Sequence, residues 1–317
     1  MLVSIIIPVY NRENIISKTI ESAISQTHKN IEILIIDNNS TDNTWKIIQS
    51  YAKYDSRIIA FKNKENIGPV MNWKRCIDEA KGYYGKILWS DDLISSTFLE
   101  KTIPLLTNND CAFVFSGTEI FFEDGSESKL AYFIGPTGYY NQLAFIEGAL
   151  FHLNYPVSPG CALFRMKDLK NNLILDVPNK INSNFAQHGI GIDLMLYLLT
   201  IKDYTKFGFI NERLSFFRSH SDSISTQSNT PDLIMLYNLT KASFLENYFY
   251  NKKLIINFNS QILIDLTIYK NKQKSTNSLK SIEDFYVINK LFNFNIIYLL
   301  KRLLVKVKKL LLTCLEI

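Results

Sequence analysis

Acidic residues follow two apolar runs of the chain, at positions where a β-strand would end. Asp91 and Asp92 come directly after residues 86–90, and Asp37 comes directly after residues 31–36. In an open α/β sheet, ligands collect beyond the carboxyl ends of the strands, so carboxylates placed there face a ligand and not the core. The two acidic strand ends therefore predict a site for a metal ion and a nucleotide.

Short β-branched runs alternate with amphipathic stretches over residues 3–122, which is typical of βαβ units with a mostly parallel sheet. The predicted strands are residues 3–8, 31–36, 58–61, 87–90 and 112–115. Helical faces are predicted from the spacing of Ile16, Ile20, Ala23 and Ile24, and of Val70, Trp73, Ile77 and Ala80. The sequence thus predicts an α/β fold in which helices flank the sheet.

The pattern becomes less regular after Gly117, where turn residues cluster around Pro156 and Pro159. Irregular segments of this kind often build substrate pockets. The further predicted elements are a helix at residues 93–105, strands at 162–165, 207–210 and 214–218, a helix at 191–199, and helical structure from residue 231 onward.

The composition is that of a globular protein with one main domain and a smaller appendage, since 47% of the 317 residues are apolar and 21% are charged. The four cysteines have no paired spacing, which indicates neither a zinc cluster nor a disulfide framework and favours a reducing cytosol. The apolar run at residues 2–9 is short, has no basic leader and contains Pro8, so we expect a buried strand and not a signal peptide.

The net charge of +5 is concentrated near the carboxyl end of the sequence, where five basic residues lie within residues 301–309 and leave the remainder neutral. Nucleic-acid binders spread basic side chains over a face, so this class is disfavoured. Residues 296–315 predict a basic amphipathic helix, which either lies on an anionic membrane surface or packs on protein.

Several nucleotide-binding classes require glycine-rich loops that the first predicted strand end does not have. Residues 8–12 read Pro-Val-Tyr-Asn-Arg and contain no glycine, which excludes a dehydrogenase fingerprint and disfavours a sugar-phosphate nucleotidyltransferase. No Gly-Lys-Ser or Gly-Lys-Thr occurs, so a P-loop is also excluded.

The order and spacing of residues 8–12, 37–42, 65–68 and 91–92 resemble the family 2 glycosyltransferases, which have the GT-A fold and use nucleotide sugars. The resemblance covers about residues 3–225. It implies a GT-A catalytic domain at residues 1–225, a helical C-terminal extension at residues 226–317, and an inverting transfer from a nucleotide-sugar donor to a saccharide or lipid-linked saccharide acceptor.

The resemblance assigns nucleotide binding to residues on several strand ends. These residues are Pro8, Tyr10, Arg12, Asp37, Asn66, Asp91 and Arg218. A carboxylate such as Asp37 accepts hydrogen bonds from a base or a ribose, although it can equally cap the turn before a helix. Tyr10 and Arg12 can also belong to an ordinary surface loop, and Arg218 can pair with a surface acid in place of phosphate.

The resemblance also implies a divalent cation, Mn²⁺ or Mg²⁺, held by Asp91 with Asp92 and His220. Such a cation neutralises the charge that develops on a departing nucleoside diphosphate. The alternatives are a solvated Asp pair at the start of a helix and a solvated histidine in a polar loop.

Asp193, in Gly191-Ile192-Asp193, resembles the family position of the catalytic base, which takes the proton of the acceptor hydroxyl. The alternative is a helix N-terminal carboxylate without chemistry. Gly160 resembles the floor of the acceptor pocket, although a turn with positive φ would also explain a glycine there.

Two positions depart from the family pattern, because Trp89 and Ile192 stand where acidic residues are usual. These departures leave open a nucleotide-sugar-binding scaffold, a pseudoenzyme without turnover. The family-level expectation is a cytoplasmic enzyme of bacterial surface polysaccharide synthesis, such as capsule or lipopolysaccharide, that is peripheral on the inner face of the membrane.

Overall fold

The computed structural model describes residues 1–220, 230–269, 278–302 and 304. Backbone contacts divide the chain into two units. The first comprises Met1–Asp176 and Asn184–Gln227, and the second Val177–Ser183 and Ser228–Ile317. The predicted boundary between residues 225 and 226 lies outside the described residues.

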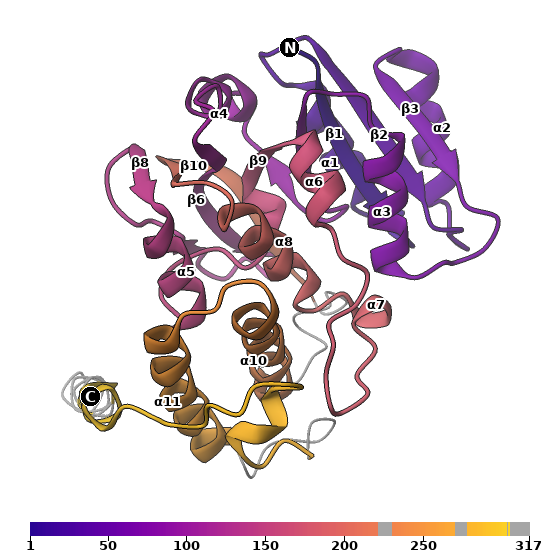
Figure 1. Cartoon of the computed structure of the whole chain (residues 1–317). Helices are drawn as coiled ribbons and strands as arrows, with labels where there is room; N and C mark the ends of the chain where they lie inside the picture. The colour runs from indigo at the N-terminus through magenta and orange to yellow at the C-terminus, as the bar shows by residue number, and fades with distance from the viewer. Residues whose placement is uncertain (221–229, 270–277, 303, 305–317) are drawn as a thin grey trace. The chain divides into compact units, whose positions relative to one another are not determined.

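The first unit is built on a ten-stranded sheet (Figure 1), in which eight strands follow the order β3-β2-β1-β4-β9-β6-β10-β5. Strand β7 pairs with β6, and β8 pairs with β10. The strands are β1 Val3–Val9, β2 Ile31–Asp37, β3 Ile58–Lys62, β4 Tyr84–Ile87, β5 Leu93–Ile94, β6 Cys111–Phe122, β7 Lys129–Ala131, β8 Gly138–Asn141, β9 Ala162–Arg165 and β10 Lys206–Ser219.

Strands β3, β2, β1 and β4 are parallel neighbours. Strand β9 is antiparallel to both β4 and β6, so β6 and its parallel partner β10 run in the same direction as β1. The sheet is therefore mostly parallel, and the carboxyl ends of β1, β2 and β4 reach the same edge.

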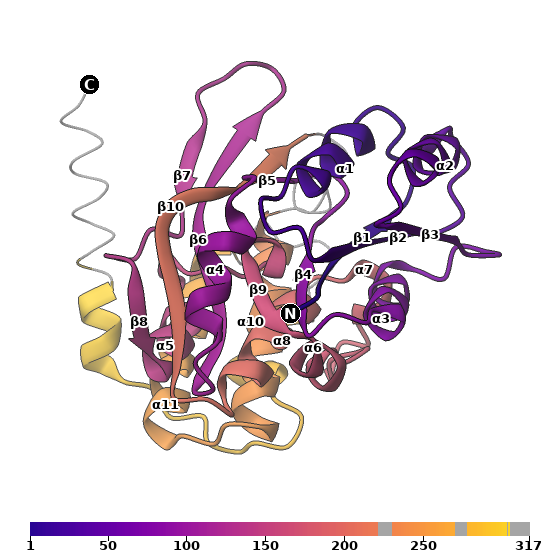
Figure 2. The same cartoon turned by 90° about the horizontal axis from the view of Figure 1, so that it is seen from above.

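Helices cover both faces of the parallel part of the sheet. In Figure 2, α1 and α2 lie on one side of β1, β2 and β3, and α3 lies on the other. The helices of this unit are α1 Ile16–Ile24, α2 Thr44–Tyr54, α3 Pro69–Glu79, α4 Phe98–Leu106, α5 Gln142–Leu150, α6 Met166–Asn172, α7 Phe185–His188 and α8 Ile192–Ile201, with the 3-10 turn η1 at Pro159–Cys161. The two helices predicted from apolar spacing, near residues 16–24 and 70–80, are thus confirmed as α1 and α3.

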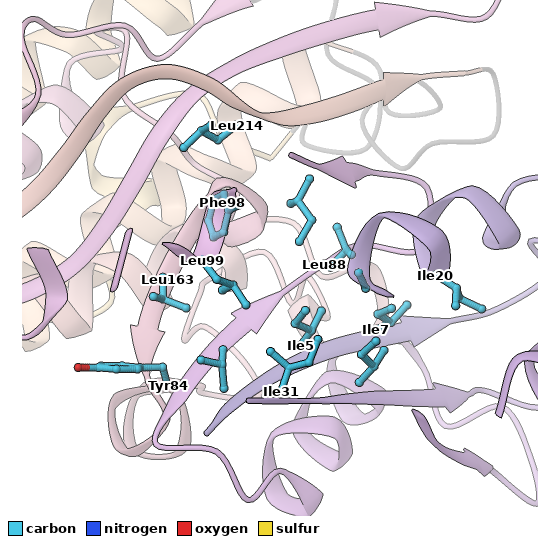
Figure 3. Close-up of a cluster of buried hydrophobic side chains, with 14 of the residues drawn as sticks. Ile5, Ile7, Ile20, Ile31, Tyr84, Leu88, Phe98, Leu99, Leu163 and Leu214 are labelled. Atoms are coloured by element: carbon cyan, nitrogen blue, oxygen red, sulfur yellow. The ribbon is translucent and has the colours of Figure 1, made fainter. Parts of the chain in front are cut away.

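Strands β1 and β2 are buried at every residue, because helices shield both faces of the sheet. Figure 3 shows Ile5 and Ile7 of β1 beside Ile20 of α1. The same buried cluster includes Leu88, just beyond β4, and Leu163 of β9. This core fixes the strand ends that carry the candidate site.

Two predicted elements near residue 90 differ in the structure. Strand β4 ends at Ile87, so the strand predicted at 87–90 is wrong beyond its first residue, and the Asp92 N–H donates to the Trp89 carbonyl in a turn (3.1 Å). The helix predicted from residue 93 begins at Phe98, because Leu93–Ile94 pairs with β10 as strand β5. In the second case, pairing with a distant strand overrides the local helix preference of residues 93–94.

The strands predicted at 207–210 and 214–218 are one continuous strand, β10. Its register against β6 shifts between Ile210 and Arg213 and again before Ser215. Such bulges bend a strand without ending it, which explains why the sequence around residues 211–213 is typical of a turn.

The second unit contains helices α10 Thr230–Asn247 and α11 Lys252–Tyr269 and the 3-10 turn η2 Ile282–Phe285, which confirms the helical prediction for this region. The side chain of Asn259 holds the following segment by donating to the carbonyls of Leu291 (2.8 Å) and Asn293 (2.9 Å). Most of the amphipathic helix predicted at 296–315 lies outside the described residues. Among the described helices, none is both long enough and apolar enough to cross a bilayer.

Candidate functional site

The loops after β1 and β2 are tied together by side-chain hydrogen bonds. The backbone N–H of Asn11, at φ +48°, donates to Ser40 Oγ (2.9 Å), and Thr41 N–H donates to Asn11 Oδ1 (2.9 Å). The Arg12 N–H donates to Thr44 Oγ1 (2.7 Å). The two loops therefore form one rigid rim at the carboxyl edge of the sheet.

Asp37 is the last residue of β2, and its fully buried side chain stabilises the turn that follows. Its carboxylate accepts hydrogen bonds from the backbone N–H (3.1 Å) and the hydroxyl of Ser40, and lies 3.8 Å from Lys62 Nζ. This is the capping arrangement that the sequence left open as an alternative. The nucleoside contact of Asp37 stays a prediction.

The other residues predicted on the nucleotide side differ in exposure. Pro8 is buried within β1, whereas the Tyr10 side chain is 40% exposed. Arg12 donates to the Asn11 carbonyl (3.0 Å), and its buried Nε has no hydrogen-bond partner among the described residues. Arg12 thus keeps a donor for a group that the described residues do not supply.

Asn66 belongs to an asparagine network that the sequence reasoning missed. Asn38 Nδ2 donates to Asn66 Oδ1 (2.8 Å), and Asn63 Nδ2 donates to Asn38 Oδ1 (2.8 Å) and Asn72 Oδ1 (3.0 Å). Asn72 Nδ2 donates to the Ile36 carbonyl (3.1 Å). The network fixes the loops after β2 and β3, and the only signal for it in the sequence is asparagine directly after two strand ends.

Asp91 and His220 meet although 129 residues separate them, because β10 returns the chain beside β5. Asp91 Oδ2 lies 2.9 Å from His220 Nε2. Arg218 Nε donates to the Asp91 carbonyl (3.0 Å), and Arg218 Nη1 pairs with Glu123 (2.8 Å). The buried Nη2 of Arg218 has no partner in the described part of the chain.

Asp92 is buried beside this pair and accepts a hydrogen bond from the Arg218 backbone N–H (3.0 Å). Its burial and the neighbouring charge of Asp91 raise the pKa of Asp92 well above its usual value. A cation binding here would offset both effects, because it stabilises the ionised form.

Lys86 of β4 contacts Gly160 at the candidate site, and the sequence analysis did not identify it. Its side chain is fully buried, Nζ donates to the Gly160 carbonyl, and the ammonium lies 4.4 Å from the centre of the Phe98 ring. Burial lowers the pKa of Lys86 to about 7. The sequence feature that could have identified Lys86 is a lysine within an apolar strand, because a buried lysine normally needs a specific partner.

Gly160 of η1 is a glycine because aromatic rings approach it closely. A Cβ atom there would lie 2.9 Å from Trp89 Cδ1 and 3.2 Å from Phe217 Cε1, and Gly160 is not among the residues with positive φ. Trp89 Nε1 donates to Ser158 Oγ (2.7 Å), and its ring packs on Trp73. Trp89 therefore packs against the turn for which an acceptor contact was predicted.

Asp193 lies in the first turn of α8, where its Oδ1 accepts from the backbone N–H groups of Gly191 (2.9 Å) and Leu194 (2.8 Å). Burial and the charges of Cys161, Asp193 and Asp92 all raise the pKa of Tyr132.

The Asp91 and His220 pair has the spacing that two ligands of one cation need. Adjacent ligands of an octahedral cation, each at about 2.1 Å, lie about 3 Å apart. The described residues contain no group of three metal-type side chains, but Mg²⁺ commonly takes one or two protein ligands together with substrate phosphates. Asp91 and His220 could therefore hold a divalent cation only together with ligands from outside the described residues.

Residues 4–173 match the profile described as glycosyl transferase family 2, which is more than half of the chain. The chain belongs to this family. The match includes Asp37, Asp91 and Gly160, whereas Asp193 and His220 lie beyond it.

Two curated relatives of this family 2 chain come from bacteria. It is 31% identical over 241 residues to the Escherichia coli UDP-Glc:alpha-D-GlcNAc-diphosphoundecaprenol beta-1,3-glucosyltransferase WfaP, covering 76% of this chain and 86% of WfaP. It is 37% identical over 125 residues to the putative teichuronic acid biosynthesis glycosyltransferase TuaG of Bacillus subtilis, covering 39% of this chain and half the length of TuaG.

Among solved structures, TarS 1–349 of S. aureus in complex with UDP-GlcNAc superposes with a TM-score of 0.65 at 17% identity. The alignment covers 88% of this chain and 78% of the TarS chain. The fold of this family 2 member is therefore GT-A, with the sheet and flanking helices described above.

Proposed function

We propose that this family 2 member transfers a sugar from a nucleotide-sugar donor to a saccharide acceptor in the synthesis of bacterial cell-surface glycans. The observation that carries the proposal is the 2.9 Å approach of Asp91 and His220 at the carboxyl edge of the sheet, next to the buried Asp92. The names of WfaP and TuaG support the glycan context.

Asp91 and His220 would hold the divalent cation, whose chemistry when bound is to neutralise the departing diphosphate. Arg12 and Arg218 each keep one buried nitrogen without a partner among the described residues. Phosphate oxygens would satisfy these donors through charge-assisted hydrogen bonds. The chain thus offers both cation ligands and cationic side chains to a nucleoside diphosphate.

Asp193 is the proposed general base. Its carboxylate would take the proton of the acceptor hydroxyl as that oxygen attacks the anomeric carbon from the face opposite the diphosphate, which inverts the configuration. The two backbone N–H donors at the start of α8 hold the carboxylate in a fixed orientation. An NMR assignment of the product anomer would overturn this mechanism if the configuration were retained.

The proposed donor is a uridine nucleotide, because WfaP is named for UDP-Glc and TarS was crystallised with UDP-GlcNAc. We expect UDP with Mn²⁺ to raise the melting temperature by several degrees, since a ligand at 100 times its Kd contributes about 2.7 kcal/mol. Thermal shift measurements with UDP, GDP, dTDP and CMP, each with and without Mn²⁺, test this. A larger shift with GDP, dTDP or CMP would refute the uridine assignment.

The proposed acceptor is a lipid-linked saccharide reached from the inner face of the membrane, as the name of WfaP suggests. Exposed apolar side chains occur in the described part of residues 288–304, which overlaps the basic tail at residues 301–309. They are Ile288, Phe294, Ile296, Ile297, Leu300 and Leu304. We propose that these side chains and the basic residues at 301–309 attach a cytoplasmic enzyme to anionic lipid as a peripheral protein.

Flotation with vesicles containing anionic lipid tests the attachment. The full chain should float with the vesicles, and a chain ending at Asn295 should remain in the dense fraction, because it loses the tail charges and most of the apolar side chains. Raising the salt concentration should weaken flotation of the full chain. Equal recovery of the two chains would contradict the proposal.

A nucleotide-sugar-binding scaffold without turnover is the second candidate. Its specific support is Trp89, which fills the space between Trp73 and Gly160 at a position where family members usually carry an acid. The two candidates differ in whether the chain transfers sugar at all.

A further inference from the structure

Tyr132 has a backbone conformation that is rare for an aromatic residue. It follows β7 directly, and its φ of +65° lies in the left-handed region. Bulky side chains seldom adopt this region, and such residues cluster at ligand sites where surrounding contacts enforce them.

The enforcing contacts come from Asn154, on a segment 22 residues away. Asn154 Oδ1 accepts from the Tyr132 N–H (2.8 Å), and Asn154 Nδ2 donates to the Phe133 carbonyl (3.1 Å). The Phe133 ring fills the space that a Cβ atom on Gly117 would take. The backbone of residues 132–133 is therefore held from two sides.

The hydrogen bonds of Asn154 hold the backbone so that the Tyr132 ring lies at the candidate site. The ring packs edge-on against Phe217, with 6.4 Å between centroids, and Phe217 borders Gly160. Phe217 directly precedes Arg218, whose backbone N–H donates to Asp92 (3.0 Å), so the Tyr132 ring packs on the strand segment that borders the predicted cation site. Burial and the charges of Asp193 and Asp92 raise the pKa of Tyr132. The Tyr132 side chain is partly buried.

We propose that Tyr132 is a substrate-binding residue whose hydroxyl donates a hydrogen bond to the sugar ring of the donor, held between Asp92 and Asp193. The inference rests on the proposed function, because it takes the diphosphate to lie at Asp91 and Asp92 and the acceptor at Asp193. The sugar of the donor is then the group between them. A neutral hydroxyl suits this role, since it remains a donor throughout the physiological pH range.

Tyr132→Phe removes the hydroxyl and keeps the ring on Phe217. With Mn²⁺ present, calorimetry should show about tenfold weaker binding of the sugar nucleotide, UDP-Glc or UDP-GlcNAc, since one such hydrogen bond is worth about that factor. Binding of UDP should be unchanged, because UDP carries no sugar. Equal binding of both ligands by wild type and variant would overturn the proposal.

Two further variants separate this role from a general structural one. Tyr139→Phe removes a hydroxyl that donates to the Leu105 carbonyl (3.0 Å) and should change neither affinity. Asn154→Ala removes the hydrogen bonds to the backbone of residues 132 and 133, so it should weaken sugar-nucleotide binding but not UDP binding. The double variant with Tyr132→Phe should show no additional loss of sugar-nucleotide binding. Parallel losses of UDP and sugar-nucleotide binding would also overturn the proposal.

The wild-type chain separates the inference from the proposed function. If it binds sugar nucleotide and transfers sugar while Tyr132→Phe behaves identically, only the inference fails. If the wild-type chain binds neither sugar nucleotide, the uridine donor and the inference both fail.

Discussion

Asp193→Asn should lower sugar transfer by about three orders of magnitude, because general-base catalysis typically contributes 10²–10⁴-fold. Asparagine keeps an oxygen that can accept the N–H groups of Gly191 and Leu194, so the start of α8 should remain intact. Mn²⁺-dependent nucleotide binding should therefore stay within about twofold of wild type, as only the proton acceptor is removed. Steady-state transfer and calorimetric nucleotide binding measure the two effects.

Asp168→Asn is the matched control for this variant. Asp168 is also an acid in the first turn of a helix, α6, where it accepts a hydrogen bond from the Tyr204 hydroxyl (2.8 Å). We expect this substitution to affect stability but not the chemical step. A scaffold protein would transfer no sugar in the wild-type form or in either variant, whereas full transfer by Asp193→Asn would remove Asp193 as the base.

Asp91→Asn should abolish the dependence of nucleotide binding on Mn²⁺ and lower transfer by about 10³-fold or more. A cation contributes several kcal/mol to the stabilisation of a departing diphosphate, and asparagine supplies a weaker, uncharged ligand. Asparagine can still form a hydrogen bond with His220 Nε2, so the end of β10 should keep its position. Calorimetry of UDP with Mn²⁺ and with EDTA, together with transfer rates, measures the loss.

Asp78→Asn serves as the control, because Asp78 is exposed on α3 and pairs only with Lys74 (2.7 Å) among the described residues. Exposed pairs of this kind contribute little, so this variant should behave as wild type. Retention of the Mn²⁺ effect in Asp91→Asn would remove Asp91 as a ligand. An equal loss in Asp78→Asn would point to a general effect of surface charge.

The local pattern of the sequence predicted the first half of the sheet well. Strands β1 and β2 are apolar except at Ser4, Glu32 and Asp37, and α1 has apolar residues at helical spacing, so each element is specified by residues close together in the chain. Parallel strands joined by helices bring their carboxyl ends to one edge, which brought the end of β2 at Asp37 and the end of β4 at Ile87, before Asp91, to the same edge.

Long-range contacts determined the features that were missed. Strand β5 exists because Leu93–Ile94 pairs with β10, more than one hundred residues later, and the Lys86 contact to Gly160 spans 74 residues. The conformation of Tyr132 depends on Asn154, and neither residue belongs to a motif. No sequence window contains both partners of any of these contacts.

The sequence by itself determined which residue types stand at the strand ends and, through the family motifs, which of them were candidates for the site. Only the tertiary structure decided that Asp91 approaches His220, that Gly160 is set by the close approach of Trp89, and that the Tyr132 ring packs on Phe217. The physical reason is that secondary structure follows from local periodicity, whereas distances between side chains follow from how the strands pair and how the core packs.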